Sequence, residues 1–247
     1  SEELARAPAD GYTLMLPSPC QLVVNPLTQK SLGFDRNTAF SLIGLTNTSP
    51  FVLLVPANSQ FRTLAEFLDY GKKNPGKLSF GSPGIGTTMH IGGEMLNAVA
   101  GLQAVHVPYR GGSQSTGDLV AGRVDFMIDS IGAVSGQLES GQLRVLAVAT
   151  PQRMPRFPDL PALAEVFPDV ELSSWLGVVG PPNLPPPIIA TLTGALQRVV
   201  ALPSYKEFVA GRGSAPADPR PEYFAAHLAR EKKRVEKTVV ARRLLLE

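Results

Sequence analysis

Residues 81–90 read Gly81-Ser82-Pro83-Gly84-Ile85-Gly86-Thr87-Thr88-Met89-His90. A strand-like run at residues 77–80 comes directly before this stretch, and a helix-like segment at residues 91–100 follows it. Three glycines and a proline predict a tight turn in which the backbone can come close to a ligand. Thr87 and Thr88 are residue types that cap the start of a helix. The stretch therefore predicts a strand, a glycine turn and a helix in succession.

The predicted helix start is also a candidate anion site. The first amides of a helix have no partner within the helix, and the positive end of the helix dipole lies behind them. A carboxylate or phosphate binds readily at such a place. The alternative is a strand-to-helix turn that binds nothing, with the histidine in a packing or capping role. The candidate ligand-binding residues here are Gly84, Ile85, Gly86, Thr87, Thr88 and His90.

The pattern on either side of the glycine turn alternates between strands and helices. Such alternation predicts an α/β architecture with a mainly parallel sheet, whose ligands bind beyond the carboxyl ends of the strands. Residues 63–66 have the pattern of a capping box. Strands are expected at residues 12–16, 51–55, 77–80, 104–108, 124–129, 143–149 and 174–179, and helices from residue 64 to about 73 and at about 88–100, 113–121, 187–200, 203–210 and 220–243.

Further candidate ligand residues follow three of these expected strands. The turn Tyr109-Arg110-Gly111-Gly112 offers exposed amides and an arginine that can pair with a carboxylate through two bonds. Asp129 can accept a bond from a ligand's ammonium or hydroxyl group, and Ser18 can reach a ligand from the other lobe. The alternatives are a solvated arginine and an aspartate that caps the next segment. Trp175 is expected to be a hinge or core aromatic.

Composition and motifs argue against several classes of protein. The net charge of +2 is too balanced for a nucleic-acid binder, and the single cysteine excludes an internal disulfide and a cysteine-based zinc site. The three histidines lie in separate segments without metal-ligand spacing. The chain has no Gly-x-Ser-x-Gly elbow, dinucleotide fingerprint or Walker motif, so we expect neither an enzyme nor a cofactor. No apolar run is long enough to span a membrane.

The chain carries an ordered set of motifs spread over residues 9–177. They are Ala9-Asp10-Gly11-Tyr12-Thr13-Leu14, Asn25-Pro26, Asn74-Pro75-Gly76-Lys77, Gly84-Ile85-Gly86-Thr87 with His90 and Gly93-Glu94, Val107-Pro108-Tyr109-Arg110-Gly111, Asp118, Gly122 and Asp125, Leu146-Ala147-Val148-Ala149-Thr150 with Arg153, and Trp175-Leu176-Gly177. In this order and spacing the motifs resemble the Bug-type receptors, which are the extracytoplasmic solute-binding proteins of tripartite tricarboxylate transporters. The resemblance covers nearly the whole chain.

The resemblance implies a type II periplasmic-binding-protein fold, in which two α/β lobes are joined by crossing strands and close on a ligand. The crossings are expected near Val52–Pro56 and near Trp175–Val179. Lobe 1 would then comprise residues 1–54 and 178–247, and lobe 2 residues 55–177. The implied ligand is a small carboxylate, such as a dicarboxylate or an acidic amino acid, held mainly by backbone amides. The implied partners are the membrane subunits of a transporter, or a sensor, in the periplasm.

The chain departs from the family pattern at its start. Family members begin with about 50 further residues, which form a strand, a Pro-Pro-Gly-Gly-type loop and a helix. Residues 1–3 are acidic and no signal peptide follows them, which is typical of a cytoplasmic protein or a mature exported one. Without that first strand, lobe 1 would have a strand edge with unpaired backbone groups, to which another chain can pair. A dimer that covers this edge is therefore one hypothesis. The alternative function is a truncated remnant or sensor that acts through protein–protein contacts instead of binding solute.

Overall fold

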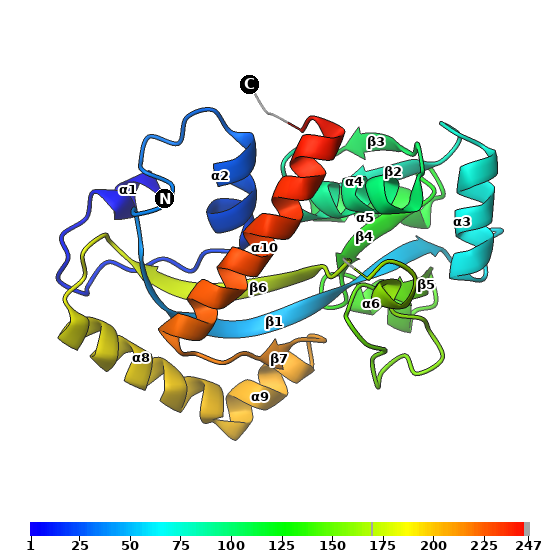
Figure 1. The fold of residues 1–247 in the computed structure, drawn as a ribbon. Helices are drawn as coiled ribbons and strands as arrows, with labels where there is room; N and C mark the ends of the chain where they lie inside the picture. The colour runs from blue at the N-terminus through cyan, green and yellow to red at the C-terminus, as the bar shows by residue number, and fades with distance from the viewer. Residues whose placement is uncertain (169, 245–247) are drawn as a thin grey trace. The chain divides into compact units, whose positions relative to one another are not determined.

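The computed structural model describes residues 1–168 and 170–244, and the chain divides into two compact units. Unit 1 comprises Ser1–Thr48 and Ser174–Glu247, and unit 2 comprises Ser49–Ser173. The chain passes from unit 1 to unit 2 within one long strand, β1 (Ser41–Pro56), and returns at the start of β6 (Ser173–Gly180). Figure 1 shows these two strands, which pair with each other.

Unit 2 is built on a mixed sheet. Strand β2 (Ser79–Ser82) pairs in parallel with β3 (Val105–Pro108), and Phe80 forms a parallel bridge with Phe126, directly before β4 (Met127–Ser130). The second half of β1 runs antiparallel to β4 and to β5 (Leu143–Val148). The prediction of a mainly parallel sheet is therefore wrong for β1. Antiparallel pairing needs no crossover helix, so the alternation of strands and helices could not reveal it.

The helices of unit 2 are α3 (Leu64–Lys73), α4 (Thr88–Ala100), α5 (Gly112–Val120), α6 (Ser135–Glu139) and α7 (Leu163–Val166). The predicted capping box of α3 is only half formed. The Thr63 hydroxyl accepts the Glu66 amide hydrogen at 3.2 Å, as expected. The Glu66 carboxylate, however, accepts from the amide of Arg62 at 2.7 Å instead of from Thr63.

The buried half of β1 organises the core of unit 2 on both of its faces. Phe51, Leu53 and Val55 belong to one hydrophobic cluster, and Val52 and Leu54 belong to a second. All five side chains are fully buried. Successive residues of a strand point to opposite faces, so the continuous apolar run packs both clusters at once. The strand predicted at residues 51–55 is confirmed.

Unit 1 contains the first half of β1, β6 and the short strand β7 (Ala215–Pro216). Its helices include the three predicted near the C-terminus, α8 (Pro186–Ala201), α9 (Pro203–Ala210) and α10 (Pro221–Arg242). Shorter helical segments lie nearer the N-terminus: α1 (Glu2–Ala5), a π-helical turn (Cys20–Val24) and α2 (Asn25–Thr28). No described helix has both the length and the apolar character that crossing a membrane requires.

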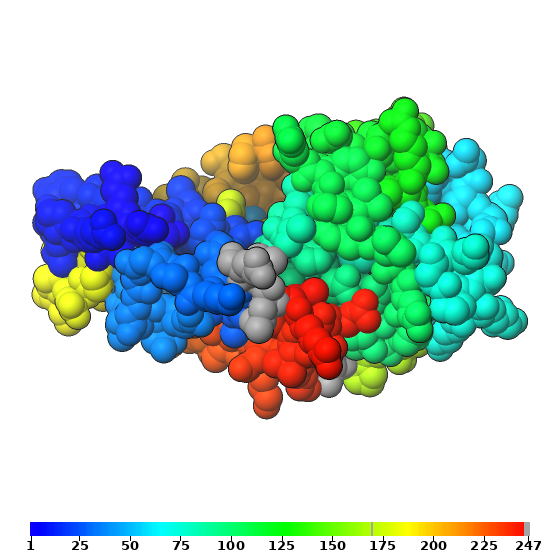
Figure 2. Space-filling model, turned by 90° about the horizontal axis from the view of Figure 1, so that it is seen from above, coloured from blue at the N-terminus to red at the C-terminus, as the bar shows by residue number. Residues whose placement is uncertain are grey.

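The strand predicted at residues 12–16 is wrong. Only Met15 is paired, in an isolated antiparallel bridge with Val179. The two residues exchange amide-to-carbonyl bonds of 2.9 and 3.0 Å. Tyr12 and Leu16 are 93% and 64% exposed, so these apolar side chains lack the packed surface that stabilises a strand. Figure 2 shows this first segment in blue beside the yellow segment that follows β6.

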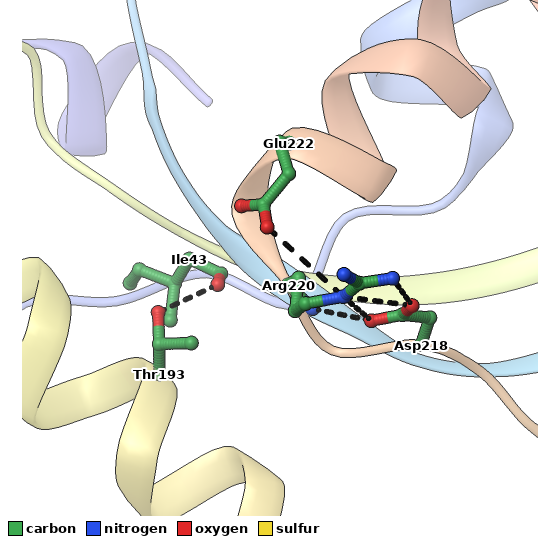
Figure 3. A network of polar contacts seen from close by, with 5 residues as sticks. All are labelled: Ile43, Thr193, Asp218, Arg220 and Glu222. Carbon is green, nitrogen blue, oxygen red and sulfur yellow. Dashed lines mark hydrogen bonds and ion pairs between the residues drawn. The ribbon is translucent and has the colours of Figure 1, made fainter.

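Figure 3 shows one side-chain bond that anchors α8 to β1 and a local network of polar contacts at the start of α10. The hydroxyl of Thr193, on α8, donates to the carbonyl of Ile43, on β1, at 2.9 Å. Directly before α10, the guanidinium of Arg220 donates to both carboxylate oxygens of Asp218. Trp175 is fully buried in unit 1, and its indole donates to the Glu231 carboxylate at 2.5 Å. Trp175 was expected to be either a hinge or a core aromatic, and it lies in the core.

Candidate functional site

Two turns of unit 2 follow the carboxyl ends of β2 and β3, and a third segment is the carboxyl end of β4 itself. Ser82 at the end of β2 is in register with Pro108 at the end of β3, and the amide of Tyr109 donates to the Ser82 carbonyl at 2.9 Å. The Phe80–Phe126 bridge puts β4 on the other side of β2, in the same direction. Residues 83–87, 109–112 and 129–130 therefore lie at one edge of the sheet, where α/β proteins bind ligands. We call these three segments the strand-end site.

The glycine turn adopts a backbone that suits glycine alone. Gly84 and Gly86 have φ of 147° and 78°, which L side chains rarely adopt. A Cβ atom on Gly84 would also lie 3.3 Å from the carbonyl oxygen of Tyr109. The first and second turns of the strand-end site are therefore in close contact through their backbones.

Hydroxyl groups tie the glycine turn to both of its flanks. The Ser82 hydroxyl lies 3.2 Å from the Gly84 amide and 3.0 Å from the Gly84 carbonyl. Thr87 is the N-cap of α4, as predicted, because its hydroxyl accepts the His90 amide hydrogen at 3.3 Å. The same hydroxyl donates to the Gly84 carbonyl at 2.8 Å. The turn is thus closed by its own side chains.

Two stacked histidines support the turn. Nδ1 of His90 accepts the Gly86 amide hydrogen at 3.2 Å, and the ring stacks on His106 with centroids 4.0 Å apart. Nε2 of His106 lies 2.7 Å from the Ser82 hydroxyl. Burial lowers the pKa of both rings, and the neighbouring His90 helps lower the pKa of His106 to about 4. Both rings are therefore neutral at pH 7, and the packing alternative describes the observed contacts of His90.

Several amides at these turns remain available to a ligand. Within the part of the chain that the structure describes, the amides of Ile85 and Met89 have no acceptor. The same holds for the consecutive amides of residues 111–114, at the start of α5. Free backbone amides at helix starts and turns bind oxyanions. Two turns therefore offer donors for the predicted carboxylate.

The predicted residues of the second turn have different surroundings. The phenol of Tyr109 donates to the Asp118 carboxylate, which also accepts from Arg123 at 2.6 Å. Burial, with this carboxylate beside it, raises the pKa of Tyr109. The exposed Arg110 side chain has no ion-pair partner among residues 1–168 and 170–244. Tyr109 therefore shapes the turn, while a ligand contact of Arg110 stays a prediction.

Asp129 lines a cavity of about 450 Å³ in unit 2. The cavity lies against the first two turns of α5, where Gly112 is one of its lining residues. Only 2% of Asp129 is exposed, and burial raises its pKa to about 6. Ser18, in contrast, belongs to unit 1, where its hydroxyl donates to Gln21 at 2.6 Å, and its contact with a ligand stays a prediction.

Sequence reasoning did not assign His106 or Ser82 to the site. A signal for His106 lies in the pairing of β2 with β3. His106 lies opposite Phe80, and residues opposite each other on neighbouring strands share a face of the sheet. The cavity residues Gln137 and Gln142 had no signal, since they come from a helix and a loop beyond β4. Among the described residues there is no group of three or more His, Cys, Asp or Glu side chains that could hold a metal.

Comparison with known proteins identifies the family. The model of the tripartite tricarboxylate transporter family receptor matches residues 1–244. The chain belongs to this receptor family. A protein encoded in the tcbD-tcbE intergenic region of Pseudomonas sp. strain P51 is 36% identical over 246 residues, which cover 99% of this chain and 73% of that protein. The resemblance inferred from the ordered motifs is confirmed.

Solved receptor structures share the fold. Rpa4515 of R. palustris, solved with adipate, has a TM-score of 0.87 and 29% identity, covering 97% of this chain and 81% of that one. MatC of Rhodopseudomonas palustris, solved with bound malate, has a TM-score of 0.83 and 25% identity, covering 96% and 82%. The predicted fold class, a two-lobed α/β periplasmic binding protein, is confirmed.

Proposed function

We propose that this protein is the periplasmic receptor of a tripartite tricarboxylate-type transporter and that it captures a small organic carboxylate. The observation that carries the proposal is the set of free amides in the two turns after β2 and β3. Membership of the receptor family supports it. The adipate and malate of the two R. palustris proteins are both dicarboxylates, which favours a dicarboxylate here.

Binding by these amides has a sufficient energetic basis. Micromolar affinity needs about 8 kcal/mol. A hydrogen bond to a charged group contributes about 1.5–3 kcal/mol, so the two free amides at Ile85 and Met89 fall short by themselves. Amides at Ile85, Met89 and residues 111–114, with Arg110 for a second carboxylate, supply enough donors. The receptor then releases the acid to the membrane subunits of the transporter. The chain's two passages between units, in β1 and at the start of β6, are the places where a hinge would bend.

The test is a thermal-shift screen of the 247-residue chain against mono-, di- and tricarboxylates, followed by calorimetry on each acid that shifts the melting temperature. A ligand at 100 times its dissociation constant adds about 2.7 kcal/mol of stability. We expect a clear shift with at least one dicarboxylate and none with uncharged diamides of the same length. If the folded chain responds to no acid, receptor function is overturned, and pull-down experiments on the remnant or sensor alternative come next.

A matched pair of variants tests the role of the cation. Arg110→Gln should weaken a dicarboxylate more than the corresponding monocarboxylate, because it removes the partner proposed for the second carboxylate. Lys77→Gln removes an exposed cation of the same unit, two residues before the start of β2, and should change neither affinity. Equal losses in both variants would mean that the effect comes from the general field of the surface.

A further inference from the structure

The cavity beside α5 differs in chemistry from the amide turns. Its polar side chains are Ser113, Thr116, Asp129, Gln137 and Gln142, and no Lys, Arg or His lines it. Hydroxyl and amide side chains with one carboxyl group suit an uncharged polar or cationic group better than a second anion. Glycine and alanine at positions 112, 117 and 133 leave the space open.

Asp129 is a buried carboxyl group without a cationic partner. Its position is fixed by β4, where it lies opposite Val52 of β1. Its bonds come from its own neighbour, since the Ser130 amide donates to Oδ1 at 2.7 Å. Among the residues that the structure describes, no Lys, Arg or His forms an ion pair with it. Buried acids rarely lack a cationic partner, because burying an uncompensated charge costs free energy. The buried acids that do lack one are concentrated at functional sites.

The topology brings this carboxyl group to the edge that carries the free amides. Asp129 is the last residue but one of β4, and β4 runs in the same direction as β2 and β3. Gly112, whose amide is free, lines the same cavity as Asp129. One small ligand can therefore meet anion-binding amides and a hydrogen-bond acceptor within the strand-end site.

We infer that Asp129 selects ligands that carry a hydroxyl or ammonium group beside a carboxylate, and that the cavity lined by Asp129 and Gly112 receives this group. The inference rests on the proposed function, because it concerns the class of acid bound at the same site. A ligand carboxylate takes the amides of residues 111–114, and its hydroxyl or ammonium group donates to Asp129. Plain acids, which carry carboxylates but no hydroxyl or ammonium group, have no donor for Asp129. A second carboxylate placed against an ionised Asp129 would be repelled.

The experiment uses matched acids that differ only in the donor group. Calorimetry at pH 7.5 compares succinate with malate and aspartate, glutarate with 2-hydroxyglutarate and glutamate, and tricarballylate with citrate. In at least one series we expect the wild-type chain to bind a substituted acid about tenfold or more tightly than the plain one, as one hydrogen bond to a charged group predicts. Asp129→Asn should reduce that ratio to within about threefold of one while plain acids still bind.

Asp125→Asn is the matched control. Asp125 directly precedes Phe126 at the other end of this strand, where its carboxylate accepts from the amide and hydroxyl of Ser79 at 2.7 and 2.8 Å. This variant should lose stability and keep the ligand ratio. The inference is overturned if wild type binds plain acids as tightly as substituted ones, or if Asp129→Asn keeps the ratio. If no acid binds to the folded wild-type chain, the proposed function itself fails and the inference falls with it.

Discussion

The amide of Gly86 donates a hydrogen bond to Nδ1 of His90 across 3.2 Å. This bond connects the glycine turn to the first turn of α4, and it requires that Nδ1 carry no proton. Burial lowers the pKa of His90 and so disfavours a charge on its ring, which stacks on His106. The neutral histidine pair therefore fixes the turn whose remaining amides we propose as donors to the ligand.

Gly86→Ala should weaken carboxylate binding. Its φ of 78° forces an alanine into the left-handed region at a cost of about 1–2 kcal/mol. If relaxation of this strain moves the Ile85 amide, the dissociation constant should rise about tenfold. Gly76→Ala is the control, because Gly76 has a φ of 74° and nothing lies within 4 Å of its added Cβ. Both variants should lose similar stability by urea unfolding, and only Gly86→Ala should lose affinity by calorimetry.

Thr87→Ala should reduce both stability and affinity. Loss of an N-cap costs about 1 kcal/mol, and here the lost hydroxyl also holds the Gly84 carbonyl. Thr63→Ala removes the N-cap of α3, which has no bond to the glycine turn among the described residues, and serves as the matched control. Thermal unfolding should show comparable losses, whereas affinity should fall only for Thr87→Ala and return with Thr87→Ser. An affinity loss of equal size in Thr63→Ala would contradict a local role for Thr87.

The fold was largely predictable because its local signals agree. The apolar run at Phe51–Val55, the N-cap at Thr87 and the proline that opens α8 each specify one element without distant help. The direction of β1 was not predictable in the same way, because strand direction depends on partners far along the chain. The expected strand at residues 12–16 failed for the related reason that one bridge to Val179 does not make a ladder.

The candidate site likewise has a part that local sequence predicts and a part that depends on distant contacts. Local sequence located the glycine turn and the turn at residues 109–112, since glycine marks close backbone approach. It could not assign Tyr109 to Asp118, nor His106 to Ser82. The first pair forms only when α5 packs beside the turn, and the second only when β2 and β3 pair. The burial of Asp129 likewise depends on β1 alongside it.

Gly93→Ala should destabilise unit 2 through its aromatic core. A Cβ at this position of α4 would lie 2.2 Å from a ring carbon of Phe80, which is fully buried. Overpacking of this kind costs about 1–3 kcal/mol. Gly136→Ala, on α6, meets nothing within 4 Å and should be neutral or gain about 0.5–1 kcal/mol from helix propensity. Urea unfolding measures both, and equal stability of the two variants would contradict the close packing at Gly93.

His106 and Asp129 should act on stability in opposite directions over one pH range. The folded pKa of His106, about 4, lies below the ordinary histidine value of 6.5, so the unfolded state binds more protons between these two pH values. Stability from this group is complete above pH 6.5 and is lost as the pH falls toward 4. The folded pKa of Asp129, about 6, lies above the ordinary aspartate value of 3.8. The folded state then binds more protons, and this group adds stability as the pH falls from 6 toward 3.8.

Single substitutions separate these two contributions. Asp129→Asn should make the stability loss between pH 6 and pH 4 steeper, by up to about 1.4 kcal/mol per pH unit. His106→Gln should make it shallower, by a smaller amount because water screens the half-buried ring. Chemical unfolding at pH 7, 6, 5 and 4 measures each slope. Carboxylates such as Glu165 titrate alike in all three proteins, so the difference between slopes isolates the substituted group. Parallel curves for wild type and Asp129→Asn would show that the pKa of this carboxyl group is not raised in the folded protein.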